Sequence, residues 1–102
     1  MKVLGAAPAP RTDRYASALL HDEPNLRMVA FRLEPGQLVP THTSPSSVLV
    51  QVIAGQGTFT GAGAIAVLTV GQSAAYEPHE PHSIAAGAEP LEFLAIIAPR
   101  PG

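Results

Sequence analysis

Apolar and polar residues alternate along much of this chain with the two-residue period that is typical of β-strands. The alternation is cleanest over residues 28–34, where Val29, Phe31 and Leu33 share one face. Residues 48–53 are equally regular and are rich in β-branched side chains. No stretch shows a long helical period, so the pattern predicts an all-β barrel or sandwich.

Glycine and proline residues divide the chain into short strands, with a turn signal roughly every ten residues. Residues 34–36, Glu-Pro-Gly, predict a turn because proline presets φ and glycine supplies conformational freedom. Residues 61–63, Gly-Ala-Gly, predict the turn of a hairpin. The other strands expected from this punctuation are residues 58–60, 65–70, 73–76, 82–86 and 91–98.

The N-terminal region is patterned less clearly than the rest. Residues 1–14 are rich in alanine and proline, and we expect them to form an arm or an edge strand. Residues 15–20 fit either a short helix or a strand, and we favour the strand because the next segment is one. Residues 21–25 are expected to form an exposed turn that carries His21.

A chain of 102 residues is large enough for one hydrophobic core. No repeat or linker interrupts the pattern, so residues 1–102 are predicted to form one domain with its barrel at about residues 15–98. Only 14% of the residues are charged, against about 25% in ordinary globular chains. Such a surface leaves apolar area to be covered, and we therefore expect a homodimer. The apolar run 91–98 is expected to be buried on both faces or to lie under the dimer contact.

Composition also narrows the classes of partner. The net charge is −2 and no cluster of lysine or arginine occurs, which argues against nucleic-acid binding. The absence of cysteine excludes disulfides and thiolate metal sites, and it fits a cytoplasmic protein. No stretch approaches the ~20 apolar residues of a membrane span, so we expect no membrane association.

Two segments each begin with a turn glycine and lead to a histidine, Gly36 to His42 and Gly71 to His82. If one strand runs unbroken from Thr41, His42 shares a face with the valines of residues 48–53 and points into the barrel. His82 shares a face with Ile84 in the strand that it begins, and so also points inward. The sequence therefore predicts two imidazoles in one cavity.

The first of these segments resembles the first motif of the cupin family, the RmlC-like jelly-roll barrels. That motif consists of a glycine, five residues, His-x-His, three or four residues, a glutamate, six residues and a glycine. Gly36, His42 and Gly55 fall on their places. Ser44 stands where the second histidine belongs, and Val48 stands where the glutamate belongs.

The second segment resembles the second cupin motif, in which a glycine and five residues precede Pro-x-Gly, two residues, a histidine, three residues and an asparagine. Gly71 and His82 match, and Pro78 lies one place after the proline of the motif. His79 occupies the glycine place, and Ala86 occupies the asparagine place.

The resemblance implies a cupin jelly-roll barrel, or double-stranded β-helix, over roughly residues 28–98. Family members with the complete ligand set hold Fe, Mn, Ni, Zn or similar ions, but only two of the four ligand places are filled here. His79 is a candidate third ligand, and Glu77 or Glu80 is a candidate to orient an imidazole. The candidate metal ligands are His42, His82 and His79.

These residues leave several functions open. The hypothesis that we favour is a cupin that binds a small molecule of unassigned identity, with or without a weakly held divalent metal. The alternatives are a metal-dependent enzyme of the dioxygenase or isomerase type and a sensor or regulatory module. The histidines also fit a purely structural role, as hydrogen-bonded side chains that fill the cavity. The candidate pocket residues are His42, His82, Val48, Val50, Phe31 and Tyr76.

Overall fold

The computed structural model describes residues 1–5 and 7–101, which form nine β-strands and no helix. The strands are β1 (Ala16–Glu23), β2 (Leu26–Leu33), β3 (Leu38–His42), β4 (Ser47–Ala54), β5 (Gln56–Gly61), β6 (Ala64–Thr69), β7 (Ser73–Tyr76), β8 (His82–Ala86) and β9 (Leu91–Ala98). In this part of the chain no helix is long and apolar enough to cross a membrane. The predicted all-β class is confirmed.

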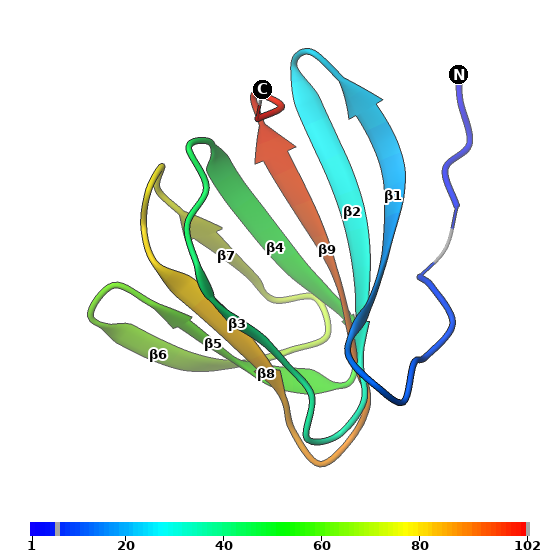
Figure 1. Ribbon diagram of the computed structural model, residues 1–102, viewed down its shortest axis with the longest axis vertical. Coiled ribbons are helices and arrows are strands. Elements are labelled where there is room, and N and C mark those ends of the chain that lie inside the picture. Colours follow the sequence, from blue (N-terminus) through cyan, green and yellow to red (C-terminus); the bar gives the residue numbers. More distant parts are fainter. Residues whose placement is uncertain (6, 102) are drawn as a thin grey trace.

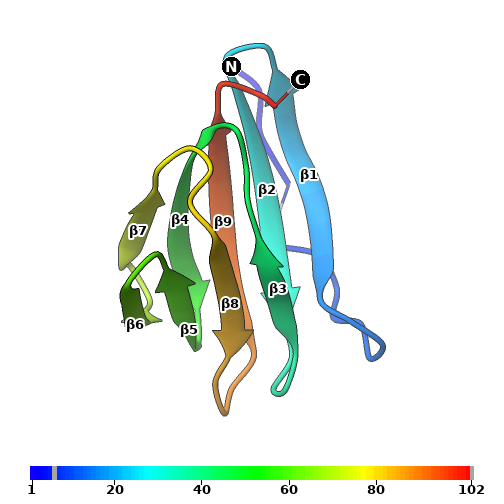
Figure 2. The same ribbon diagram turned by 60° about the vertical axis from the view of Figure 1, so that its left-hand side comes forward.

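The strands form two antiparallel sheets that face each other (Figures 1 and 2). The five-stranded sheet has the order β1-β2-β9-β4-β7, and the four-stranded sheet has the order β3-β8-β5-β6. Most strands from β2 to β9 that follow each other in the chain lie in different sheets. This connectivity is that of a jelly-roll barrel, as the sequence predicts.

The inner faces of both sheets share one hydrophobic core. Along β4, Val48, Val50 and Val52 are buried while the residues between them face outward, as their alternation predicts. The strand over residues 91–98 is β9, and it lies between β2 and β4 with one face in the core. The buried apolar residues of the core are Leu33, Val39, Val48, Val50, Val52, Phe59, Leu68, Tyr76, Ile84, Leu91, Phe93 and Ala95.

The N-terminal segment forms a strand from Ala16, so the strand favoured over a helix is confirmed. The described residues before Ala16 lie outside both sheets and run beside β1 as an arm (Figure 1). The expectation of an exposed turn at His21 is wrong. His21 lies within β1, is half-buried and contacts Glu23 through Nε2 at 2.9 Å. The reason is that β1 and β2 pair almost to their ends, which reduces the turn to residues 24–25.

The link between β4 and β5 requires glycine because another part of the backbone passes close to it. Gly55 has a φ of 72°, in the left-handed region that side chains disfavour. A β-carbon at this position would also collide with the backbone carbonyl of Pro90, just before β9. The glycine that the sequence predicts to end the strand over residues 48–53 therefore also permits the β4–β5 link to pack closely against the link before β9.

Candidate functional site

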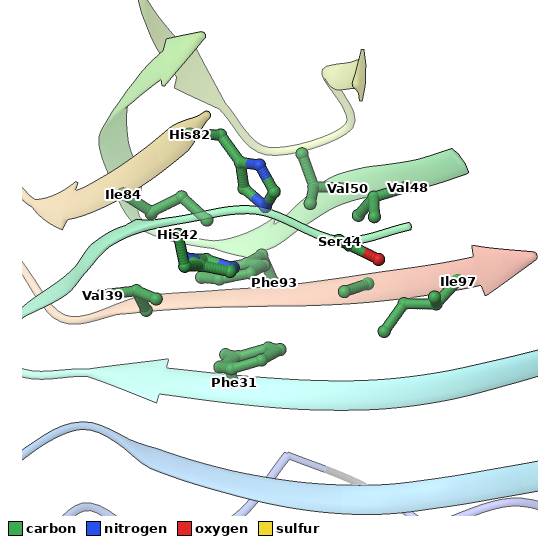
Figure 3. Close-up of a pocket in the computed structure, with 11 residues that line it drawn as sticks. Phe31, Val39, His42, Ser44, Val48, Val50, His82, Ile84, Phe93 and Ile97 are labelled. Atoms are coloured by element: carbon green, nitrogen blue, oxygen red, sulfur yellow. The ribbon is translucent and has the colours of Figure 1, made fainter. Parts of the chain in front are cut away.

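A cavity of about 130 Å³ lies between the two sheets (Figure 3). Its walls are almost entirely apolar, and the polar side chains that line it are His42, Ser44 and His82. The lining residues are Phe31, Val39, His42, Ser44, Val48, Val50, His82, Ile84, Phe93, Ala95 and Ile97.

A β-bulge in β3 turns His42 toward this cavity. Val39 pairs with Ile84 of β8, and His42 pairs with His82. Two residues separate the paired positions on β3, but only one separates them on β8. The extra residue shifts the alternation by one place, so that Val39 and His42 both line the cavity although they are three positions apart.

The strand that was expected to run unbroken from Thr41 into the valine-rich segment does not exist. β3 ends at His42, and β4 begins at Ser47 in the other sheet. The chain must cross between the sheets here, and Pro45 lies in the crossing. His42 faces inward as predicted, but because of the bulge and not because it shares a strand with Val48.

The two histidine rings meet at one end of the cavity. Their centroids are 4.1 Å apart, and their planes are inclined by 59°. The side chain of His82 is directed toward His42 (Figure 3). His82 is 4% exposed, whereas His42 is exposed. The imidazole pair therefore extends from the buried core to the surface.

Both rings are held in the same tautomer by backbone carbonyls two residues earlier. His42 donates from Nδ1 to the carbonyl oxygen of Pro40 at 2.9 Å, and His82 donates from Nδ1 to that of Glu80 at 2.7 Å. A carbonyl oxygen only accepts, so Nδ1 carries the proton in each ring. In the neutral rings, Nε2 then carries a lone pair that accepts hydrogen bonds or binds a metal ion.

Tyr76, one of the predicted pocket residues, lies behind His82 and does not line the cavity. Its ring stacks on that of His82 with centroids 4.4 Å apart and planes inclined by 18°. The Tyr76 hydroxyl is buried and has no hydrogen-bond partner within residues 1–5 and 7–101. Burial, with a smaller contribution from the charge of Glu80, raises the pKa of Tyr76. Tyr76 thus supports the imidazole by packing.

Glu80 orients His82, as its position in the sequence suggested, but through its backbone carbonyl. Its carboxylate instead accepts hydrogen bonds from the backbone N–H groups of Glu77 at 2.9 Å and Ala62 at 3.0 Å. These two donors hold the pKa of Glu80 below its usual value. Glu80 therefore ties the corner before His82 to the tip of the β5–β6 hairpin.

His79 does not join the other two histidines. It is exposed and lines a shallow depression outside the cavity, together with Glu77 and Pro78. Its φ is 66°, the left-handed conformation expected at the glycine place of the second cupin motif. Nowhere in the described part of the chain do three His, Cys, Asp or Glu residues form a group that could hold a metal. The predicted three-histidine ligand set is therefore not assembled.

The predicted pocket residues Phe31, Val48 and Val50 do line the cavity with the two histidines. The rest of the wall includes residues that were not predicted from the sequence, namely Val39, Ile84, Phe93, Ala95 and Ile97. Phe93, Ala95 and Ile97 occupy alternate positions of β9, so the sequence indicates that they share one face of the strand. Which face of β9 turns inward, however, depends on its pairing with β2 and β4.

Comparisons with known proteins agree with this architecture. The family model described as Cupin domain matches residues 29–97. Comparison with curated protein sequences gives no significant match. Several solved structures are similar to this one over nearly the whole chain. An RmlC-like cupin protein from Desulfovibrio desulfuricans is 29% identical, with a TM-score of 0.84 and 97% of each chain covered.

Two further solved structures share the fold at lower identity. The protein TT1209 from Thermus thermophilus is 23% identical, with a TM-score of 0.85, covering 92% of this chain and 91% of that one. The DMSP lyase DddQ from Ruegeria pomeroyi is 22% identical, with a TM-score of 0.79. That match covers 84% of this chain but 47% of the lyase.

The buried hydroxyl of Tyr76 predicts a loss of stability in alkali. Tyrosine in an unfolded chain ionises near pH 10, and the pKa of Tyr76 is raised in the fold. Above about pH 10 the unfolded chain therefore releases a proton that the folded chain retains, which favours unfolding. Urea unfolding at about pH 8 and pH 10.5 should show a smaller alkaline loss in Tyr76→Phe than in the wild type.

Tyr15→Phe is the matched control for this prediction, because it removes the other tyrosine of the chain from a position outside the buried core. An alkaline loss of the same size in Tyr76→Phe and the wild type would contradict the assignment.

Proposed function

The chain belongs to the cupin family, and on this premise we propose that it binds a small molecule in the cavity between its two sheets. The observation that carries the proposal is the meeting of His42 and His82 in a cavity whose other walls are almost wholly apolar. An apolar pocket with a few convergent polar groups is the usual form of a small-molecule site.

The size of the cavity limits the part of the ligand that enters it. An apolar cavity of about 150 Å³ engineered in another protein accommodates benzene, and the cavity here is about 130 Å³. The ligand group that fills it is therefore about the size of a six-membered ring. Phe31 and Phe93, whose stacked rings have centroids 4.8 Å apart, offer it a flat aromatic wall.

A variant that fills the cavity tests this function without altering either histidine. Ala95 lines the cavity and is 5% exposed, so Ala95→Leu should occupy the space that the ligand needs. We expect benzene to raise the melting temperature of the wild type in a saturable manner and to have no such effect on Ala95→Leu. Ala85→Leu, on the outer side of β8, adds the same bulk outside the cavity and should bind as the wild type does.

Absence of a saturable shift in the wild type, or an equal shift in Ala95→Leu, would contradict binding in the cavity.

The metal that the cupin family implies does not fit the side chains present. The two Nε2 lone pairs would suit a divalent ion, but Ser44 and Val48 stand at the other first-motif ligand places, and His79 lies outside the cavity. Structural metal sites have four ligands and catalytic sites about three from the protein. We therefore propose that Fe, Mn, Ni or Zn is held weakly at most, and that the ligand binds without it.

Elemental analysis of protein purified without a histidine tag tests this point. After supply of Fe, Mn, Ni and Zn, we expect less than about a tenth of an equivalent of metal, because the site has two protein ligands. The double variant Ser44→His, Val48→Glu restores the missing ligand types and serves as the positive control. Stoichiometric metal in the wild type that is lost in His42→Ala would support the metal-dependent enzyme instead.

We also propose that the protein forms the homodimer expected from its low charge. Support comes from the outer face of the five-stranded sheet, where Leu49 pairs with Ile96 and Gln51 pairs with Leu94. These residues line a groove, and Leu49 is 50% exposed. An apolar sheet face is a suitable surface for an isologous contact between two copies.

Light scattering at micromolar concentration should give a dimer mass for the wild type and a monomer mass for Leu49→Lys, because a lysine would place a charge in the contact. Ile65→Lys is the control, since Ile65 is 74% exposed on β6 of the other sheet. A monomeric wild type, or a dimer lost only in the control, would overturn the proposed interface.

A further inference from the structure

The two histidines place hydrogen-bond acceptors at a cavity that offers them few donors. Each Nδ1 is engaged by a backbone carbonyl, so each neutral ring presents the lone pair of Nε2. Among the described lining side chains, Ser44 carries the one hydroxyl. Its Oγ accepts a hydrogen bond from the backbone N–H of Ser46 at 3.2 Å, and its O–H remains a single donor. One serine hydroxyl cannot satisfy both lone pairs, so a further donor comes from solvent, which reaches the exposed His42, or from a ligand.

The lining also restricts the charge of that ligand. Among the described residues, no lysine or arginine lines the cavity. While both imidazoles are neutral, an anionic group would therefore place further acceptors beside the two lone pairs without a balancing charge. The same part of the chain contributes no aspartate or glutamate to the lining, so a cation would be buried among apolar side chains without an opposite charge. Burying an unpaired charge is costly, which favours an uncharged ligand.

We propose that the ligand is an uncharged molecule with a ring-sized apolar body and a hydroxyl or amino group that donates a hydrogen bond to Nε2 of His42 or His82. This inference rests on the proposed function and specifies the chemical class that the cavity takes. The apolar body lies against the aromatic wall of Phe31 and Phe93, and the donor group faces the imidazole pair. The backbone carbonyls of Pro40 and Glu80 set this preference, because they fix the tautomer of both rings.

The affinities of three probes of similar size distinguish a preference for hydrogen-bond donors from the burial of an apolar ring alone. Phenol has one hydroxyl donor, fluorobenzene has nearly the same shape without a donor, and benzoate is an anion. Titrations followed by NMR at about pH 8, where free imidazole is neutral, should be run with and without EDTA to test for bound metal. We expect phenol to bind roughly tenfold more tightly than fluorobenzene, the gain of one well-formed hydrogen bond, and benzoate to bind least.

The histidine variants connect this preference with the imidazole pair. The double variant His42→Leu, His82→Leu replaces both acceptors by apolar groups, so phenol should lose its advantage there while fluorobenzene still binds. Retained binding of fluorobenzene also shows that the double variant is folded. His79→Leu removes a histidine outside the cavity and should preserve the preference of roughly tenfold.

Each outcome bears on a different claim. Equal affinity for phenol and fluorobenzene would overturn the inferred preference for a hydrogen-bond donor but would leave the proposed small-molecule binding intact. No binding of any probe would overturn the proposed binding and, with it, the inferred preference. A preference that disappears with EDTA would assign it to a metal ion and overturn the inference. Two-bond ¹⁵N–¹H spectra should show Nδ1 protonated in both neutral rings. A neutral ring with its proton on Nε2 would have no acceptor facing the ligand, and this result would overturn the inference.

Discussion

The pairing of β3 with β8 is the constraint on which the candidate site depends. Between Val39 and His42 the register places two residues of β3 opposite one residue of β8. Without this bulge the alternation of the strand would direct His42 to the outside, and the cavity would have a single imidazole. The same pairing sets His42 opposite His82, which brings two segments that are distant in the chain into ring contact.

The imidazole pair is supported by ordinary packing and backbone contacts. Tyr76 stacks on the ring of His82, and the carbonyl of Glu80 accepts from its Nδ1. The carboxylate of Glu80 in turn holds the hairpin tip at Ala62 to the same corner. A ring fixed in this way needs little reorganisation to meet a ligand, which is the physical advantage of a preformed site.

Ser44 and Val48 alter what a cupin barrel of this size can do. Val48 packs into the core at the place where the family motif has a glutamate, and it cannot coordinate an ion. The walls that remain are apolar, so the two lone pairs are the main polar feature of the cavity. We propose that this combination shifts the barrel from holding a metal toward recognising an uncharged molecule that donates hydrogen bonds. The exposed outer face of the five-stranded sheet is a separate feature, and it concerns assembly rather than chemistry.

The sequence by itself determined the features that depend on neighbours in the chain. Alternation identified the buried face of β4, and the continuous strand from His82 to Ile84 correctly predicted that His82 points inward. Tertiary structure decided the rest. His42 points inward because of a bulge in the pairing of β3 with the distant strand β8. His79 lies outside the cavity, in the corner between β7 and β8, where its own backbone is left-handed. Strand register and corner geometry are set by contacts between remote segments, which a local pattern of residues does not encode.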